Sequence, residues 1–354
     1  MTRPVSTPGG IECRAGSPAV AIAGRASPRD PRDAVFDEVA RLAAADPRVW
    51  VLTNDMGALG LDALRVRFPA RVVNVGIAEQ NMVTVAAGLA LGGKRVFTYG
   101  ILAHVTARCY EQLRLDVCAH GLPVIGLGVG AGLSYGADGP THHGIYDLPL
   151  LRALPGLALY NPADGATAAA AVRLAAAGGG PAFIRLDKEA PAPLHDAATT
   201  DFAAGAAVLR AGADACVVAT GCSVARALAA ADALAAAGLA VTVVDVFRLK
   251  PLPVATLAPL VGAARAVVTV EEHAPVGGLG SAVAELLAEL GAAPRLRRLA
   301  LPDAFHLGAT SRAAAEAAYG LGADGVAAAV LELVAGAAPR RAAARTAVEA
   351  EVAS

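Results

Sequence analysis

Short apolar runs that end in polar residues or glycine alternate along the chain with alanine-rich stretches. In the first half, the runs predict five buried strands, at Val49–Leu52, Val72–Val75, Val96–Tyr99, Val124–Leu127 and Phe183–Leu186. The stretch Ala78–Leu91 predicts a helix, because it has helical composition and ends at Gly92-Gly93, a helix stop signal. Such alternation is typical of a parallel sheet with helices on both faces.

The second half repeats this kind of pattern without an obvious sequence repeat. Its apolar runs predict strands at Ala215–Ala219, Val241–Val246 and Val267–Val270. Helices are expected at Ser223–Ala237 and Ser281–Leu290. The predicted fold class is therefore α/β, with two domains that both have mainly parallel sheets.

Two changes in composition give the expected domain limits. The start of the chain is rich in Pro, Gly, Ser and Arg, and the Pro191-Ala192-Pro193 segment separates the two α/β units. We expect a flexible arm, a first domain, a second domain and a tail at residues 1–28, 29–190, 191–336 and 337–354.

Composition excludes several classes of protein. A chain of 354 residues with 55% hydrophobic and 17% charged residues is not wholly disordered. Much of its apolar content is alanine, and no strongly apolar run of about 18 residues predicts a membrane-spanning helix. With 30 Lys and Arg against 31 Asp and Glu, the net charge of -1 gives no reason to expect a nucleic-acid partner.

The cysteines and the first residues bear on the cellular compartment. The five cysteines form no Cys-x-x-Cys pair and show no metal-ligand spacing, which is typical of reduced thiols in a cytoplasmic protein. The first residues do not form the long apolar segment of a secretory signal. We therefore expect a cytoplasmic protein.

Polar residues gather where the predicted strands end, which is where sites form in open α/β sheets. Four such loops stand out, at Thr53–Asp55, Asn74–Asn81, Asp138–His143 and Arg185–Lys188. Glu79 lies where one loop opens an apolar helix. It is either a carboxylate that complements the helix dipole or a buried acid with a raised pKa that gives or takes a proton.

The segment from Gly136 to Gly144 is more specific. Glycines and a proline stiffen a loop that carries Asp138, His142 and His143. Three interpretations stay open: a metal site, although adjacent histidines rarely converge on one ion, a structural turn, and a substrate site that binds hydroxyls and moves protons. The glycine-rich turn Gly277–Gly280 either holds a phosphate at a helix N-terminus or allows close packing.

Several motifs together resemble the C-terminal part of the transketolase family of thiamine diphosphate enzymes. The matching stretches, in family order, are Val73–Met82 (VNVGIAEQNM), Gly136–His142 (GADGPTH), Phe183–Arg185, Val270–His273 and Gly277–Gly280. They span residues from about 30 to 335, and the ordered set is more specific than any single motif.

The resemblance implies a subunit rather than a whole enzyme. The family fold has a diphosphate-binding domain, a pyrimidine-binding domain and a third domain, and this chain resembles the last two. The diphosphate domain carries a Gly-Asp-Gly motif for Mg²⁺, and these 354 residues contain none. The resemblance thus implies thiamine diphosphate as cofactor, Mg²⁺ held mainly by a separate diphosphate-binding subunit, and self-association to a heterotetramer.

The resemblance also assigns roles to single residues. Glu79 matches the glutamate that hydrogen-bonds the cofactor's pyrimidine, so it is expected to be protonated, with a raised pKa. Asp138 and His142 match residues that contact substrate hydroxyls and assist proton transfer. The residues expected to contact a substrate phosphate are Arg185 and, less directly, Arg32, while Asp55 matches a polar residue near the cofactor.

Three departures from the family pattern affect the site. Aligned on Arg108–Gln112, the positions where many members place aromatic rings on the pyrimidine fall at Leu102 and Val105, which implies apolar contact without stacking. Gly130 stands where sugar-phosphate transketolases carry a histidine. The sequence around His142 and His143 is nearer to deoxyxylulose-phosphate synthase.

The resemblance leads to one expected function and two alternatives. We expect the pyrimidine-binding subunit of a split transketolase that moves a two-carbon ketol unit from a ketose to an aldose, acting on a sugar or sugar phosphate. The first alternative is a split acyloin-forming enzyme, like deoxyxylulose-phosphate synthase, that decarboxylates a 2-oxo acid. The second is a non-catalytic scaffold subunit.

Overall fold

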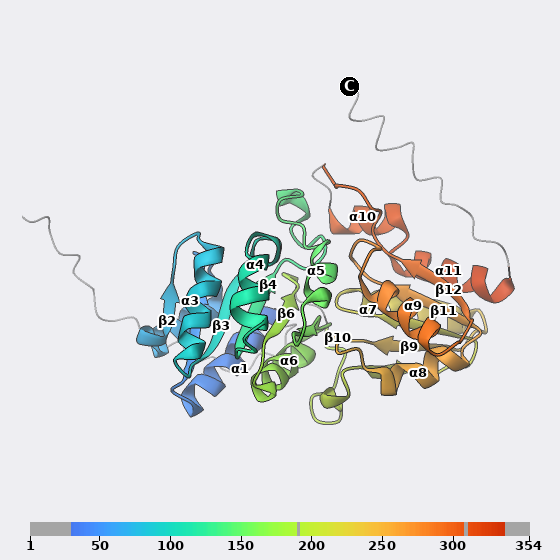
Figure 1. The fold of residues 1–354 in the computed structure, drawn as a ribbon. Helices are drawn as coiled ribbons and strands as arrows, with labels where there is room; N and C mark the ends of the chain where they lie inside the picture. Colours follow the sequence, from blue (N-terminus) through green and yellow to red (C-terminus); the bar gives the residue numbers. More distant parts are fainter. Residues whose placement is uncertain (1–29, 190–191, 308–310, 337–354) are drawn as a thin grey trace, which may run out of the picture.

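Two α/β units lie side by side in the chain (Figure 1). The computed structural model describes residues 30–189, 192–307 and 311–336, so the predicted arm at 1–28 and tail at 337–354 lie outside the described residues. One unit contains a seven-stranded sheet and the other a five-stranded sheet. Both sheets are mainly parallel, which confirms the predicted fold class.

The first sheet has the strand order β10-β5-β6-β4-β3-β1-β2. Its strands are β1 (Val49–Thr53), β2 (Val72–Asn74), β3 (Arg95–Ile101), β4 (Val124–Val129), β5 (Ala158–Tyr160), β6 (Ala182–Leu186) and β10 (Arg248–Lys250). All neighbours pair in parallel except β10, which runs antiparallel to β5. The register sets Thr53 opposite Asn74 on one side and Tyr99 on the other, so polar residues meet at one edge.

Helices cover both faces of the first sheet, as the alternating pattern predicts. One face is covered by α1 (Pro31–Ala45), α2 (Leu59–Arg67) and α6 (Gly165–Gly178). The other is covered by α3 (Glu79–Leu91), two π-helical segments, η2 (His104–Arg108) and η3 (Leu113–Cys118), around α4 (Tyr110–Gln112), and α5 (Asp147–Ala153). A single-turn η1 (Pro69–Arg71) precedes β2, and η4 (Gly136–Asp138) lies in the loop before α5.

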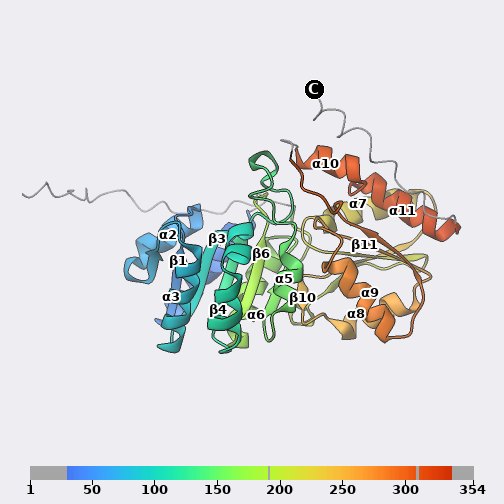
Figure 2. The same ribbon diagram turned by 45° about the horizontal axis from the view of Figure 1, so that its top comes forward.

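The second sheet has the order β12-β11-β8-β9-β7, with β7 antiparallel at one edge. Its strands are β7 (Ala207–Arg210), β8 (Ala215–Ala219), β9 (Val241–Asp245), β11 (Ala266–Val270) and β12 (Arg295–Leu299). Its helices are α7 (Ser223–Ala236), α8 (Val254–Ala263), α9 (Leu279–Glu289), α10 (Arg312–Tyr319) and α11 (Ala323–Ala335), and η5 (Phe202–Ala204) precedes β7. Figure 2 shows α10 and α11 following one another along the edge of this unit.

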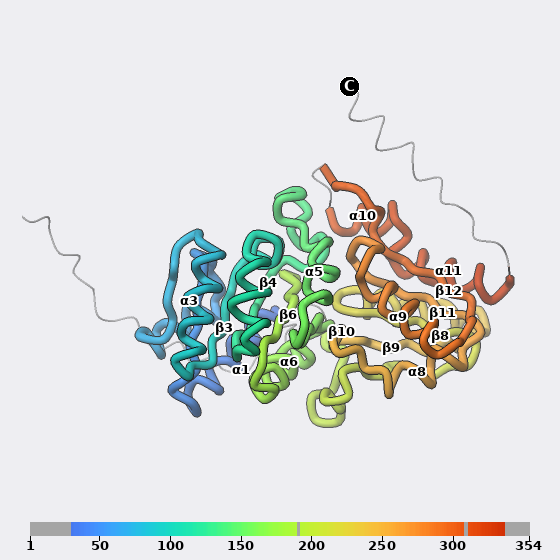
Figure 3. The backbone as a smooth tube through the Cα atoms, in the orientation of Figure 1, coloured from blue at the N-terminus to red at the C-terminus, as the bar shows by residue number. Residues whose placement is uncertain are grey.

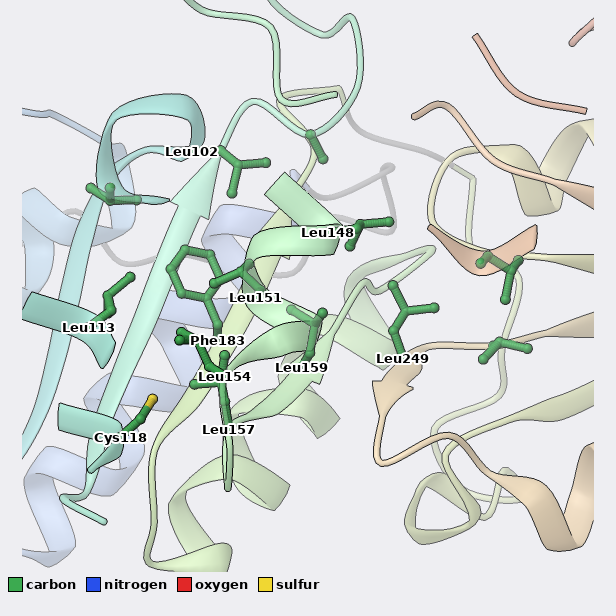
Figure 4. Close-up of a cluster of buried hydrophobic side chains, with 14 of the residues drawn as sticks. Leu102, Leu113, Cys118, Leu148, Leu151, Leu154, Leu157, Leu159, Phe183 and Leu249 are labelled. Atoms are coloured by element: carbon green, nitrogen blue, oxygen red, sulfur yellow. The ribbon is translucent and has the colours of Figure 1, made fainter. Parts of the chain in front are cut away.

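The units are joined by a shared edge strand and a shared core. β10 comes from the second half of the chain but completes the first sheet, and it lies between the units (Figure 3). One hydrophobic cluster runs from the first unit into the second, through Leu151, Phe183, Leu249 and Val283 among others. Figure 4 shows part of it, with side chains from η3, α5, β5, β6 and β10.

The sequence pattern misses four strands, β5, β7, β10 and β12. β5 and β10 have three residues each and β7 has four, so none has a long apolar run. β12 reads RLRRL and lies at an edge of its sheet, where only one neighbouring strand covers it. Short length at β5, β7 and β10, and an edge position with charged residues at β12, therefore remove the apolar signal from which strands were predicted.

One stretch of the described residues, Arg312–Ala335, is long and apolar enough to cross a membrane by length and composition. It consists of two helices, because Gly320 at φ +67° ends α10. α11 packs against α7 and β11 through the buried side chains of Val326, Ala329 and Val330. This packing makes the stretch part of the fold of the second unit.

Candidate active site at the carboxyl edge of the first sheet

The carboxyl ends of β1, β2, β3 and β4 bring the predicted loops to one edge of the first sheet. β1 ends at Thr53, β2 at Asn74 and β3 at Ile101, and β4 leads into the loop 130–146 before α5. Because these strands are parallel, their carboxyl ends share one edge. We call the group formed there by Asn54, Glu79, His104, Arg108 and His142 the Glu79 site.

Glu79 begins α3, and two side chains donate hydrogen bonds to its carboxylate. Asn54 Nδ2 donates to Oε1 at 2.9 Å, and Arg108 Nη1 donates to Oε2 at 2.9 Å. Glu79 is only 2% exposed, whereas the side chain of Arg108 is 48% exposed. The carboxylate is therefore buried beneath an arginine that reaches solvent.

The expectation that Glu79 has a raised pKa is wrong for this arrangement. Burial raises the pKa of Glu79, but hydrogen bonds from its own backbone N–H, Arg108 and Asn54 and the charge of Arg108 together hold it below its usual value. The apolar residues of α3 that follow Glu79 suggested a dry site. Arg108 lies 29 residues away in the chain and was not paired with Glu79 from sequence.

His104 connects Glu79 to the loop that carries His142. His104 Nδ1 lies 3.8 Å from Glu79 Oε1, and its Nε2 lies 3.1 Å from the carbonyl oxygen of Thr141. The His104 and His142 rings are 5.3 Å apart between centroids. The structure thus brings Glu79 and His142 to one place through His104, a residue that sequence reasoning did not select.

The other residues expected at this edge lie on its exposed side. Asp138 is exposed and His142 is half-buried, and His142 Nδ1 lies 2.9 Å from Thr141 Oγ1. Asp55, at φ +65°, exchanges hydrogen bonds with Asn74: its backbone N–H donates to Asn74 Oδ1 at 2.9 Å, and its Oδ1 accepts from Asn74 Nδ2 at 3.0 Å. Asp55 therefore ties the ends of β1 and β2 together.

The two positions expected to contact the pyrimidine are buried in the core. Leu102 is 0% and Val105 is 3% exposed, and Leu102 lies above Phe183 in Figure 4. A Cβ added at Gly100 would lie 2.5 Å from Val105 Cγ1 and 2.6 Å from Asn54 Oδ1. Val105 and Asn54, the partner of Glu79, therefore both lie close to Gly100, and the Leu102 and Val105 side chains are buried away from the exposed side of the edge.

Arg185 is engaged away from the exposed edge. Its Nε donates to Asp147 Oδ2 at 2.5 Å, and its Nη2 donates to Asp147 Oδ1 at 3.1 Å and to the carbonyl oxygen of Gly144 at 2.9 Å. Both side chains are nearly fully buried, at 3% and 2% exposed. The structure thus does not support the expected phosphate contact, because a buried carboxylate already holds the guanidinium.

The carboxyl ends of β6 and β11 continue this buried charge network, which we call the interdomain seam (Arg185, Asp147, Asp187, Glu272 and Arg312). Arg312 of α10 donates to Asp187 at 2.6 Å and to Glu272 at 2.9 Å. Glu272 also accepts from the backbone N–H of Leu133 at 2.6 Å. The seam therefore fixes the loop 130–146 between the two units.

Two glycines in that loop leave room for this anchoring. Gly132 has φ +64°, and an added Cβ would lie 2.2 Å from Glu272 Oε1. At Gly130, φ +109°, a Cβ would lie 2.5 Å from the Tyr135 ring. The tyrosine thus occupies the space beside the position where a histidine is found in sugar-phosphate transketolases.

Tyr135 marks where positive charge reaches the exposed edge. Lys188 Nζ lies 4.4 Å from its ring centroid, and the His142 ring lies 5.8 Å from it. Burial raises the pKa of Tyr135, the charge of Arg32 lowers it and that of Asp138 raises it. Arg32 itself is paired with Asp30 through bonds of 2.8 and 3.0 Å.

Contacts of the described residues bear on two further interpretations. The backbone N–H groups of Leu279 and Gly280 both donate to the Glu271 carboxylate at 2.7 Å, so the glycine-rich turn holds a carboxylate of the protein and not a phosphate. Among the residues that the structure describes, no three His, Cys, Asp or Glu side chains are grouped to hold a metal ion. Four cysteines in this part of the chain are free thiols, and Cys13 lies outside it.

The fold and the site define a class of protein in which a pyrimidine-binding unit is joined to a smaller α/β unit. The model of the "Transketolase, pyrimidine binding domain" matches residues 27–192, and that of the "Transketolase, C-terminal domain" matches residues 204–333. The chain belongs to the transketolase family.

Its relatives include subunits of split enzymes. The chain is 36% identical over 276 residues to the 6-deoxy-6-sulfo-D-fructose transketolase subunit SqwH of Clostridium sp., covering 77% of this chain and 85% of that one. It is 32% identical to one of the apulose-4-phosphate transketolase subunits of Phocaeicola vulgatus, covering 86% and 97%. A solved structure described as a split gene transketolase, inactive beta4 tetramer, matches with a TM-score of 0.79 and 36% identity over 86% and 98% of the two chains.

Other relatives are longer proteins. The chain is 37% identical to 1-deoxy-D-xylulose-5-phosphate synthase of Synechococcus sp., but it spans only 41% of that protein. Membership of the family implies dependence on thiamine diphosphate. The residues present fit the pyrimidine part of this cofactor: Glu79 offers a buried carboxylate, and Arg108, which covers it, reaches solvent.

Proposed function

We propose that the chain is the pyrimidine-binding subunit of a split transketolase that transfers a two-carbon ketol unit from a ketose to an aldose. The observation that carries this proposal is its match to transketolase subunits over 85–98% of their length. A separate subunit would bind the diphosphate and ligate most of the Mg²⁺, and the two chains would form a heterotetramer. A cytoplasmic location stays a prediction.

The residues of the Glu79 site would divide the work between cofactor and substrate. Thiamine diphosphate, when bound, supplies the nucleophilic carbon for breaking and forming a bond next to a carbonyl. Glu79 would hold the pyrimidine and a proton at its carboxylate. In the chain alone, hydrogen bonds from the Glu79 backbone N–H, Arg108 and Asn54 hold the Glu79 pKa low, so moving Arg108 away on binding would raise that pKa.

His142 and Asp138 would act on the substrate from the exposed side of the edge. His142 Nδ1 is bonded within its loop, at Thr141 Oγ1, which leaves Nε2 for a substrate hydroxyl. Asp138 is exposed on the same loop and would accept a hydroxyl hydrogen bond. The seam holds both residues in place through Leu133 and Gly144.

Because Arg185 is buried against Asp147, we assign the substrate phosphate contact to Lys188 and Arg32 instead. Lys188 is exposed and lies over the Tyr135 ring, and the charge of the half-buried Arg32 acts on the same tyrosine. We expect Lys188→Met to weaken binding of a phosphorylated substrate about tenfold, since bonds between charged groups contribute about 1.5–3 kcal/mol. An unphosphorylated analogue should be bound unchanged, and equal losses for both would contradict the assignment. Lys94→Met, at a lysine beside Trp50, is the control.

Reconstitution tests the proposal as a whole. The chain is mixed with a candidate diphosphate-binding subunit, thiamine diphosphate and Mg²⁺, and ketol transfer between sugars is followed. Calorimetry on the chain alone should show weak cofactor binding and no turnover. Tight Mg²⁺-dependent binding to the isolated chain would contradict the division between two subunits.

The second candidate is a split acyloin-forming enzyme that decarboxylates a 2-oxo acid. The observation that favours it is the identity of 37–38% to 1-deoxy-D-xylulose-5-phosphate synthases. Release of CO₂ from a 2-oxo acid by the reconstituted complex, without ketol transfer, would favour this candidate. Failure of both assays with cofactor bound would return the chain to the class of scaffold subunits.

A further inference from the structure

We propose that His104 is a positioning residue: its Nδ1 and the Glu79 carboxylate take up one shared proton when Arg108 is displaced, and its Nε2 fixes the His142 loop. The catalytic part of this inference rests on the proposed function, whereas the proton sharing does not. Three contacts carry it: Nδ1 to Glu79 Oε1, Nε2 to the Thr141 carbonyl oxygen, and the His104 ring to the His142 ring.

The Thr141 carbonyl fixes the tautomer of His104. A carbonyl oxygen accepts hydrogen bonds and has none to donate, so the 3.1 Å contact requires the hydrogen to be on Nε2. In the neutral ring, Nδ1 then carries a lone pair. That lone pair faces the Glu79 carboxylate, which is also an acceptor.

The distance between His104 Nδ1 and Glu79 Oε1 indicates that no hydrogen lies between them. At 3.8 Å, Nδ1 and Oε1 are too far apart for a hydrogen bond. Burial and the charge of Arg108 lower the pKa of His104, and Glu79 is held ionised, so at neutral pH neither atom carries a proton. One proton placed on either group would turn this facing pair into a hydrogen bond.

The groups around His104 set how its charge depends on Glu79. The Glu79 carboxylate favours the charged ring of His104. Arg108, which lies with His104 on η2, and His142 of the loop oppose that charge. Any ligand that displaces Arg108 would therefore let the pair take up one proton. The Nε2–H bond to Thr141 strengthens when the ring is charged, so the His142 loop is held most firmly in that state.

Proton sharing can be measured on the full chain without any turnover. Histidine ¹⁵N and ¹³C NMR titrations give the pKa of His104, assigned by the signal lost in His104→Gln. Glu79→Gln should lower the His104 pKa by about one unit and Arg108→Gln should raise it, since a charge within about 4–6 Å shifts a pKa by 1–3 units. His120→Gln, at an exposed histidine, should leave it unchanged. A His104 pKa that ignores both Glu79 and Arg108 would overturn the proposal.

Two substitutions separate proton sharing from simple anchoring in the reconstituted complex. Glutamine can still donate to the Thr141 carbonyl but cannot titrate, whereas phenylalanine can do neither. We expect His104→Gln to lower kcat at least about tenfold and to remove one limb of its pH profile. A wild-type kcat and pH profile for His104→Gln, with loss only in His104→Phe, would leave anchoring alone and overturn the shared proton. If the wild-type complex transfers no ketol unit, the proposed function fails while the titration still decides the shared proton.

Discussion

The Glu79 site and the interdomain seam are built from the same kinds of side chain, at the carboxyl ends of parallel strands, yet they differ in exposure. In the seam, Arg185 with Asp147 and Arg312 with Asp187 are at most 9% exposed on either side. In the Glu79 site, the carboxylate is 2% exposed but its arginine is 48% exposed. Beside it, Asp138 is exposed and His142 is half-buried.

This difference in exposure distinguishes a charge network that supports the fold from one that can bind a ligand. In the seam, buried carboxylates and arginines satisfy one another, so their charge is neutralised inside the protein. In the Glu79 site, one face of the charge network meets solvent and can change partners when a ligand arrives. A polar residue after a buried strand thus marks the edge of the sheet, but only its partners decide whether it serves chemistry or support.

Removing a seam arginine should produce the largest loss of stability. Arg185→Met leaves Asp147 buried without its partner, and breaking a buried pair costs about 3–5 kcal/mol. The double variant Arg185→Met/Asp147→Leu removes both charges and should be more stable than the single variant. Urea unfolding of the full chain measures this. A single variant as stable as wild type that weakens only phosphorylated substrates would restore Arg185 to the substrate site.

A buried ion-pair cluster around His195, which joins the two units, should make the free energy of unfolding depend on pH. His195, 0% exposed at its side chain, lies 3.2 Å from Asp164 of the first unit and 3.2 Å from Asp245 of the second. Burial opposes its charge, but the two carboxylates raise the pKa of His195 to about 9. Because the folded pKa exceeds the unfolded value of about 6.5, the contribution, on the order of 3 kcal/mol, is complete below pH 6.5 and is lost as the pH rises through 9.

The control for this pH dependence is a variant without the titrating imidazole of His195. Burial raises the pKa of Asp245 to about 6, despite the opposing effect of His195, and loss of the ring would raise it further, so the control variant is His195→Gln/Asp245→Asn. Between pH 6.5 and 9.5, the free energy of unfolding should fall for wild type relative to this double variant. Parallel curves for the two proteins would show that His195 is not charged in the folded state.

The smallest effect on stability is expected at the exposed loop. Asp138→Asn should change the free energy of unfolding by less than about 0.5 kcal/mol, as is usual for surface positions. In the reconstituted complex it should raise KM for a hydroxylated substrate about tenfold, because a bond to a charged acceptor is weakened. Asp62→Asn, an exposed aspartate on α2, is the matched control. An unchanged KM for Asp138→Asn would place Asp138 outside the substrate site.

The comparison also shows what the sequence could and could not predict. Apolar runs placed the central strands within a residue or two, as at β8, because burial on both faces leaves a continuous signal. Edge strands such as β12 and β10 lack that signal, and β10 crosses to the other unit's sheet. The motifs marked Glu79 and the His142 loop through local spacing.

Local motifs and spacing could not predict hydrogen-bond partners that are distant in the sequence. Arg108 and Asn54 meet Glu79 across 29 and 25 residues, and Asp147 meets Arg185 across 38. These partners set the Glu79 pKa low and bury Arg185, the two points at which the sequence expectation fails. His104 follows β3 directly, and its place between two aligned cofactor positions was the one available signal for it.

The central claim is that Glu79 does chemistry, whereas buried carboxylates of similar appearance only support the fold. Turnover and thermal melting of the reconstituted complex are measured together for wild type, Glu79→Gln and Glu38→Gln. Glu38 is buried on α1 and pairs with Arg41 and Arg173, so its loss should lower the melting temperature and spare turnover. Glu79→Gln should keep the melting temperature and bind cofactor within about tenfold, but lower kcat by about 10²-fold or more. A near-normal kcat with a lowered melting temperature for Glu79→Gln would contradict the account.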